Sequence, residues 1–151
     1  MLLILRWIYL FLRQRLHRKR LILEATFYLL ISRIALKLIP YRKISVFLNR
    51  PIKSREISYI ERERLEKEVI WAICLVAKHL PGETVCFPRA IAAQEILRWY
   101  GIYTTLYYGA RTDFEQGLET HVWLQDGEKG ILGHNTEHPY KVLARYPQFR
   151  N

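Results

Sequence analysis

The feature that most constrains this chain is a short segment that reads as a helix buried on most of its sides. Residues 86–101, "CFPRAIAAQEILRWYG", carry a proline in the expected first turn and end at a glycine, the residue type that stops helices in the left-handed conformation. Between these signals the apolar positions are spread around the helix: Ile91, Ala92, Ile96 and Leu97. Such a helix needs other elements packed around it, so the rest of the chain has to supply them.

Helical patterns dominate the sequence before this segment. Residues 1–20 and 21–39 are predicted as two helices. The segment of residues 41–53 is predicted to contain a short helix, which Pro51 ends. Residues 58–80 are predicted as one long helix with a charged first half and an apolar second half. Ser58 and Glu61 match a capping box at its start.

Strand patterns follow the glycine at the end of the buried helix. "IYTTLYYGA" and "HVWLQ" alternate in character, and "DGEKG" is a turn signal before "ILGHN". A chain of 151 residues that is 50% hydrophobic has room for one packed domain. We therefore expect a single α+β domain over residues 1–151, with a helical N-terminal half packed on the core helix and an antiparallel sheet. Residues 1–68 would form the basic helical part and residues 69–151 the core.

The positive charge of the chain is confined to its first half. Residues 1–68 contain sixteen Lys and Arg against six Asp and Glu, whereas residues 69–151 contain eight of each, which together account for the totals of 24 and 14 and the net charge of +10. This asymmetry favours an acidic partner, an anionic membrane surface or nucleic acid, with unpartnered solvated helix faces as the alternative. No phosphate-binding loop or nucleic-acid-binding motif occurs, so no nucleic-acid partner is expected.

The apolar stretches of the N-terminal region are too interrupted to cross a membrane. Arg6 breaks the run from Leu2 to Leu12, and three charged residues interrupt residues 21–39, so neither offers about 20 consecutive apolar residues. An amphipathic helix that lies on a surface or packs on a neighbour fits residues 21–39 better. Two cysteines and no secretory pattern make the cytoplasm the expected compartment, with membrane contact through the basic helices left open.

Cys86 stands at the start of the buried helix, where a thiol can become a nucleophile. The free N–H groups and the positive end of the helix dipole favour the thiolate, and the same N–H groups can hold an oxyanion during acyl transfer. Cys74 lies within "WAICLVAK", in the middle of the preceding predicted helix, and is interpreted as a core residue.

A cysteine nucleophile needs a general base from a second element, and His121 is the candidate. It opens the predicted strand "HVWLQ", where alternation places it on one face with Trp123 and Gln125. That face could be turned toward the helix that bears Cys86. A purely structural or exposed histidine is the alternative.

A third residue would orient the imidazole. In a hairpin closed by a four-residue loop over "DGEK", the residue opposite His121 is His134, followed by Asn135, whereas a tighter turn at residues 126–127 would place Leu132 there. We favour the four-residue loop and Asn135, with His134 second. Asp126 is interpreted mainly as a turn former. His134 and His138 do not form a metal-binding pattern, so neither a metal nor another cofactor is expected.

Together, "CFPRAIAAQEILRWYGIYTTLYYGA" and "HVWLQDGEKGIL" resemble the transglutaminase-like and papain-like cysteine peptidase superfamily, and most closely the transglutaminase-like B proteins of lasso-peptide biosynthesis. In that family a cysteine starts a core helix and a histidine opens an "HAW" or "HVW" strand. The basic, leucine-rich front that ends near "LIPYRK" is also similar, so the resemblance covers most of the chain.

This resemblance implies that the protein removes the leader from a ribosomally made precursor peptide, before a separate ATP-dependent cyclase closes the core peptide. Cys86 would be the nucleophile and His121 the proton carrier. The family's usual third residue is acidic, but "GILGHNTE" contains no Asp, so Asn135 is the first choice and Asp126 or Glu137 remain alternatives. The resemblance also implies a separate leader-binding protein as partner. Acyl transfer to an amine and a non-enzymatic docking role are the competing functions.

Overall fold

The computed structural model describes residues 16–51, 55–82, 86–113, 117–134 and 140–148. Among these residues four helices precede four strands. The order, helices first and strands second, is as predicted, although five helices and three strands were expected. The helices are α2 (Leu16–Leu38), α3 (Tyr41–Leu48), α4 (Tyr59–His79) and α5 (Cys86–Trp99). The strands are β1 (Thr105–Asp113), β2 (Gly117–Asp126), β3 (Lys129–Leu132) and β4 (Lys141–Tyr146). The α+β fold expected from the sequence is confirmed.

Most of the predicted helix boundaries are confirmed, and one is wrong. α2 runs without interruption through residues 20 and 21, where two separate helices were predicted, because no proline, glycine or capping residue stands there. At the start of α4, the Ser58 hydroxyl accepts a hydrogen bond from the Glu61 N–H at 3.3 Å, as the capping box requires. α5 begins at Cys86 and is followed by Gly101 in the left-handed conformation, with φ +76°.

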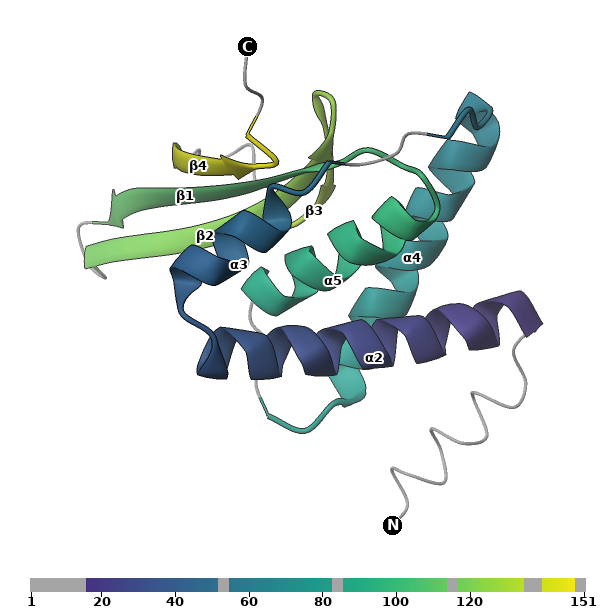
Figure 1. Ribbon diagram of the computed structural model, residues 1–151, viewed down its shortest axis with the longest axis horizontal. Coiled ribbons are helices and arrows are strands. Elements are labelled where there is room, and N and C mark those ends of the chain that lie inside the picture. The colour runs from purple at the N-terminus through teal and green to yellow at the C-terminus, as the bar shows by residue number, and fades with distance from the viewer. Residues whose placement is uncertain (1–15, 52–54, 83–85, 114–116, 135–139, 149–151) are drawn as a thin grey trace.

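α5 is the central element of the molecule. Figure 1 shows it between α2 and the sheet, and it contacts α2, α4, β1 and β2. Three alanines allow this close packing because they are fully buried and bring the helix backbone near its neighbours: Ala90, Ala92 and Ala93. The core formed around them is continuous from α2 to the sheet.

The sheet is antiparallel, with the strand order β3-β2-β1-β4. β4 is an element that the sequence analysis did not predict. It is a short edge strand in which Ala144 and Tyr146 pack toward the core while Lys141, Val142 and Leu143 are exposed. A strand with so few buried side chains has a weak apolar signal, and only its pairing with β1 defines it.

A buried glutamine ties α5 to the sheet. The Gln94 Nε2 amide donates to the carbonyl oxygen of Thr104 at 3.1 Å and to that of Tyr146 at 2.9 Å. Gln94 is 0% exposed, and these bonds link the middle of α5 to the start of β1 and the end of β4. The helix that bears Cys86 is therefore fixed against the sheet by polar as well as apolar contacts.

Charged side chains hold α4 against the β2–β3 hairpin. The Arg62 guanidinium forms a two-bond ion pair with Asp126, and Lys129 lies 3.3 Å from the Glu66 carboxylate. Burial and the adjacent Asp126 carboxyl raise the pKa of Glu66. These contacts position the hairpin that follows the candidate base His121.

Candidate functional site

Cys86 is the first residue of α5, as predicted, and it is half-buried against the core. The next residue, Phe87, fixes this end of the helix against the sheet. Its ring stacks on that of Tyr108 in β1 with the centroids 6.2 Å apart, and it also contacts Tyr41. The nucleophile candidate is therefore held at a defined helix start next to the sheet.

His121 lies on β2 and shares a face with Trp123 and Gln125, as alternation predicts. That face is not the one against which the helices pack. Val122 and Leu124, which point the other way, belong to the core formed with α5. The suggestion that the His121 face is turned to the body of α5 was therefore wrong, because sequence alternation defines two faces but does not say which one is covered.

The His121 face of the sheet carries a cluster of aromatic rings. Trp123 stacks on Tyr107 with a centroid separation of 5.5 Å, and His121 stacks on Trp123 at 6.3 Å. The ring of Tyr140 lies closest to the imidazole, at 5.1 Å. We call His121, Trp123, Tyr107 and Tyr140 the outer aromatic cluster.

Gly109 is required for this cluster to form. It pairs with His121 in the β1–β2 ladder, and a Cβ at this position would lie 2.8 Å from the Trp123 ring and 2.9 Å from the Tyr140 Cβ. The Trp123 ring and the Tyr140 Cβ therefore occupy the space that a side chain at residue 109 would fill.

The imidazole of His121 is oriented by a backbone group. Its Nε2 atom lies 2.7 Å from the carbonyl oxygen of Gly133. A carbonyl oxygen only accepts hydrogen bonds, so Nε2 carries the proton and donates it, and Nδ1 of the neutral ring is left as the acceptor. This is the tautomer that a general base acting through Nδ1 needs.

The hairpin explains why Gly133 reaches this position. Asp126 pairs with Lys129, so the turn contains only Gly127 and Glu128, one pair tighter than the four-residue loop expected. The register at the turn is the one expected, since Gln125 pairs with Gly130, but a bulge beside Leu124 then shifts it. The ladder ends at the pair of Leu124 and Leu132, before it reaches His121. The following glycine, at φ +70°, turns its carbonyl toward the imidazole.

The predicted third residues fall in different places. Asn135, the first choice, and Glu137 lie outside the described residues, so Asn135 stays a prediction. His134 does not contact the imidazole of His121 in any hydrogen bond found, and its Nδ1 lies 3.2 Å from the Gln125 amide nitrogen. Asp126 forms its ion pair with Arg62, in line with a structural role in the hairpin.

Tyr140, whose ring lies against His121, is held by charged residues of β1 and β2. Its hydroxyl donates to a carboxylate oxygen of Glu119 at 2.7 Å, and the Arg111 guanidinium lies 4.9 Å from its ring centre. Burial raises the pKa of Tyr140, with further contributions from the Glu119 carboxylate and from the charge of Cys86, against the opposing effect of Arg111.

The second cysteine is not where the sequence analysis expected it. Cys74 is exposed on α4 rather than buried in the core. Its neighbours Ile73 and Ala77 are buried, so the helical period directs Cys74 outward from between buried positions. The apolar character of the segment "WAICLVAK" obscured this, because both sides of the helix carry apolar residues there.

Two residues of this region were not singled out by sequence reasoning. Gly133 carried only a weak signal, since a glycine after a predicted strand is common in turns. Tyr140 carried none, because its role depends on a chain reversal that brings it over β1. No group of three His, Cys, Asp or Glu side chains that could hold a metal ion occurs within the described ranges.

Comparison with known proteins identifies the family. Residues 26–145 match the family described as the transglutaminase-like superfamily. Searches of curated proteins and of solved structures give no match. The family match includes α5 with Cys86, β2 with His121 and the hairpin that supplies Gly133. Since it extends over well more than half of the sequence, the chain belongs to the transglutaminase-like superfamily.

Proposed function

We propose that this protein is a cysteine peptidase that removes the leader from a ribosomally made lasso-peptide precursor. The superfamily includes cysteine peptidases and acyltransferases, which supports the general reaction. The lasso-peptide role is supported by the resemblance of residues 86–133 and of the basic front to the B proteins of that biosynthesis. Cys86 is the proposed nucleophile and His121 the proposed general base.

The observation that carries the proposal is the hydrogen bond between His121 Nε2 and the Gly133 carbonyl. It holds the imidazole in the tautomer that leaves Nδ1 free to accept a proton. The ring of Tyr140, with its centroid 5.1 Å from that of His121, further limits the orientation of the imidazole.

The proposed reaction proceeds in two steps. The Cys86 thiolate attacks the carbonyl carbon at the end of the leader, and free N–H groups at the start of α5 stabilise the resulting oxyanion. The C–N bond then breaks, and protonated His121 gives its proton to the departing amine of the core peptide. Water, activated by His121, hydrolyses the leader thioester and restores the thiol.

The sheet geometry suggests how Cys86 approaches the imidazole. β3 pairs with β2 only over Leu124–Asp126, so the described residues provide no hydrogen-bonded neighbour for β2 beside His121 on that side. Gly133 lies beside this part of β2, since its carbonyl oxygen is 2.7 Å from His121 Nε2. We infer that Cys86, at the start of α5, reaches His121 past the edge of β2 that Gly133 borders rather than through the sheet.

Leader cleavage in a purified system tests the proposal. The full chain is incubated with a candidate precursor peptide, with and without the leader-binding protein, and the products are weighed by mass spectrometry. Cys86→Ala and His121→Ala are each expected to abolish cleavage, at least 1,000-fold as an order of magnitude for a lost nucleophile or base. Cys74→Ala and His79→Ala are matched controls, because both residues lie exposed on α4.

The products separate the competing functions. A leader with a free carboxylate indicates hydrolysis, whereas a leader joined to an added amine indicates acyl transfer. Full cleavage by a folded Cys86→Ala or His121→Ala protein would refute the proposed catalytic pair. Absence of any reaction with every precursor, together with an unreactive Cys86, would favour the docking role.

The third residue is tested separately. Asn135 is retained as the proposed side-chain partner of the imidazole. If Asn135→Ala lowers kcat by less than about threefold, the Gly133 carbonyl is sufficient to orient His121, and if it lowers kcat about 100-fold or more, Asn135 is also required.

A further inference from the structure

The outer side of α2 is an exposed apolar surface without a partner among the described residues. The core-facing side of the helix includes Leu21, Ala25 and Leu29. The opposite side carries large apolar residues that are between 42% and 85% exposed: Leu16, Leu23, Phe27, Leu30, Ile31, Ile34 and Leu38. Their spacing of three, four and seven residues forms one continuous row. We call these seven residues the α2 outer stripe.

The length and continuity of the stripe distinguish it from scattered surface residues. α2 contains 23 residues, so the row extends over about 34 Å of helix. Single exposed apolar side chains need no explanation, but a contiguous row of this length marks a binding surface. No helix among the described residues is long and apolar enough to cross a membrane.

The charges around the stripe are almost all positive. Among the described residues, 16–23 contain three Arg and Lys and no Asp or Glu, and Lys37, Arg42 and Lys43 follow at the other end of α2. The single acid within α2, Glu24, is paired with Arg20 at 2.7 Å. An apolar row flanked by cations matches the composition of helices that lie in the interface of anionic membranes.

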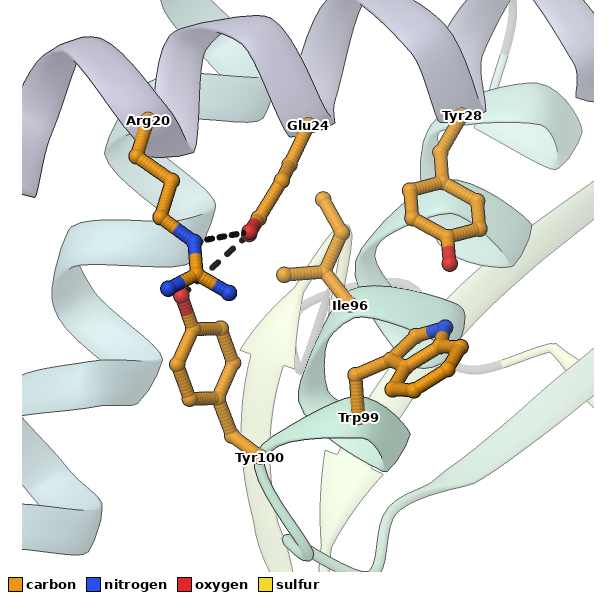
Figure 2. A pocket seen from close by; sticks show the side chains of 6 residues that line it. All are labelled: Arg20, Glu24, Tyr28, Ile96, Trp99 and Tyr100. Carbon is orange, nitrogen blue, oxygen red and sulfur yellow. Dashed lines mark hydrogen bonds and ion pairs between the residues drawn. The ribbon is translucent and has the colours of Figure 1, made fainter.

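Aromatic residues border the stripe on one side. A cavity of about 290 Å³ lies between α2 and the end of α5, and Figure 2 shows Arg20, Glu24 and Tyr28 of α2 directed toward Trp99 and Tyr100. Arg20 is within one helical turn of Leu16 and Leu23, so the cavity adjoins the stripe. Trp99 is 78% exposed at its rim. Tryptophan and tyrosine rings of this kind are enriched where proteins meet the headgroup region of a bilayer.

We infer that the α2 outer stripe binds the surface of an anionic phospholipid bilayer, with α2 parallel to the membrane plane. A second copy of the chain is a poorer occupant, because a symmetric contact through this face would oppose two clusters of positive charge. The inference does not depend on the proposed peptidase activity. Cys86 lies at the end of α5 farthest from Trp99, so membrane binding leaves the catalytic end of that helix accessible.

Vesicle flotation with the full chain tests this inference. The protein is expected to float with vesicles of phosphatidylcholine and phosphatidylglycerol, and much less with phosphatidylcholine alone. Phe27→Glu and Ile34→Glu, at positions 57% and 55% exposed, should each lower the partition coefficient at least tenfold. Leu143→Glu is the matched control, since Leu143 is 55% exposed on β4, and it should not change binding. Lys37→Gln should weaken binding to anionic vesicles about fivefold.

Several results would overturn the inference. One is that the protein does not float with anionic vesicles. Another is that Phe27→Glu and Ile34→Glu leave flotation unchanged while circular dichroism shows that both variants are folded. Sedimentation of the lipid-free chain provides a further check. A dimer that Ile34→Glu dissociates, without vesicle binding by the unmodified chain, would show that the stripe is a protein interface instead.

Discussion

Replacing Gln94 by Met is expected to weaken the attachment of α5 to the sheet and to lower the stability of the protein by an amount that the structure allows us to estimate. The substitution preserves the length of the side chain but removes both hydrogen bonds, leaving the carbonyl groups of the buried residues Thr104 and Tyr146 without these donors. Each such loss costs about 1–3 kcal/mol. The Gln94 Oε1 atom is buried and has no hydrogen-bond partner among the described residues, so its removal recovers part of this cost. The expected loss in the free energy of unfolding is about 2–4 kcal/mol.

Urea unfolding followed by circular dichroism measures this loss. For a chain of this size, each kcal/mol shifts Tm by roughly 2–4 °C, so Tm should fall by about 4–16 °C with no change in m. Gln125→Met is the matched control, because Gln125 is only partly buried and should lose less than about 1 kcal/mol. A loss below about 1 kcal/mol for Gln94→Met would refute the reasoning that these two bonds hold the cysteine-bearing helix on the sheet.

Three further outcomes are expected. The first uses a Cys74→Ser background, which removes the exposed thiol. Near neutral pH, iodoacetamide should modify Cys86 at least ten times as fast as it modifies the thiol of free glutathione. An equal or slower rate would show that the Cys86 thiol is not activated. Burial, and then the adjacent carboxyl group, raise the pKa of Glu66, so the folded state binds its proton more tightly. The resulting stability is present below about pH 4.5 and is lost as pH rises through the raised pKa; Glu66→Gln should flatten the dependence of Tm on pH across this window, and an unchanged profile would contradict it. Gly109→Ala should destabilise the protein by about 1–3 kcal/mol in urea unfolding, because the added methyl group would meet the Trp123 ring. An unchanged stability would show that the outer aromatic cluster can rearrange around the methyl group without cost.

Local signals in the sequence were sufficient to predict the main elements. The proline and glycine that bound the buried helix, the Ser58 cap and the turn signal "DGEKG" each act over a few residues, so they can be recognised without knowledge of the fold. The turn itself is tighter than the four-residue loop that was favoured. The position of Cys86 at a helix start follows from the same signals. β4 escaped prediction because its residues become a strand only through pairing with β1.

The surroundings of His121 could not be predicted in the same way. Alternation assigned the imidazole to a face with Trp123, but which face the helices cover depends on how β2 packs on α5. The β2–β3 ladder ends at the pair of Leu124 and Leu132, and Gly133, in the left-handed conformation, then directs its carbonyl to the imidazole; neither the bulge beside Leu124 nor the end of the ladder has a signal in the sequence.

The sequence alone therefore determined the α+β class, the helix that Cys86 begins and the strand that bears His121, because helix caps, turns and periodicity are properties of neighbouring residues. Only the tertiary structure decided what surrounds these side chains. Tyr140 comes to lie against His121 because β4 folds back along β1, and Cys74 is exposed because α4 turns that side away from the core. Such contacts join residues far apart in the chain, and their energies depend on packing that no local pattern contains.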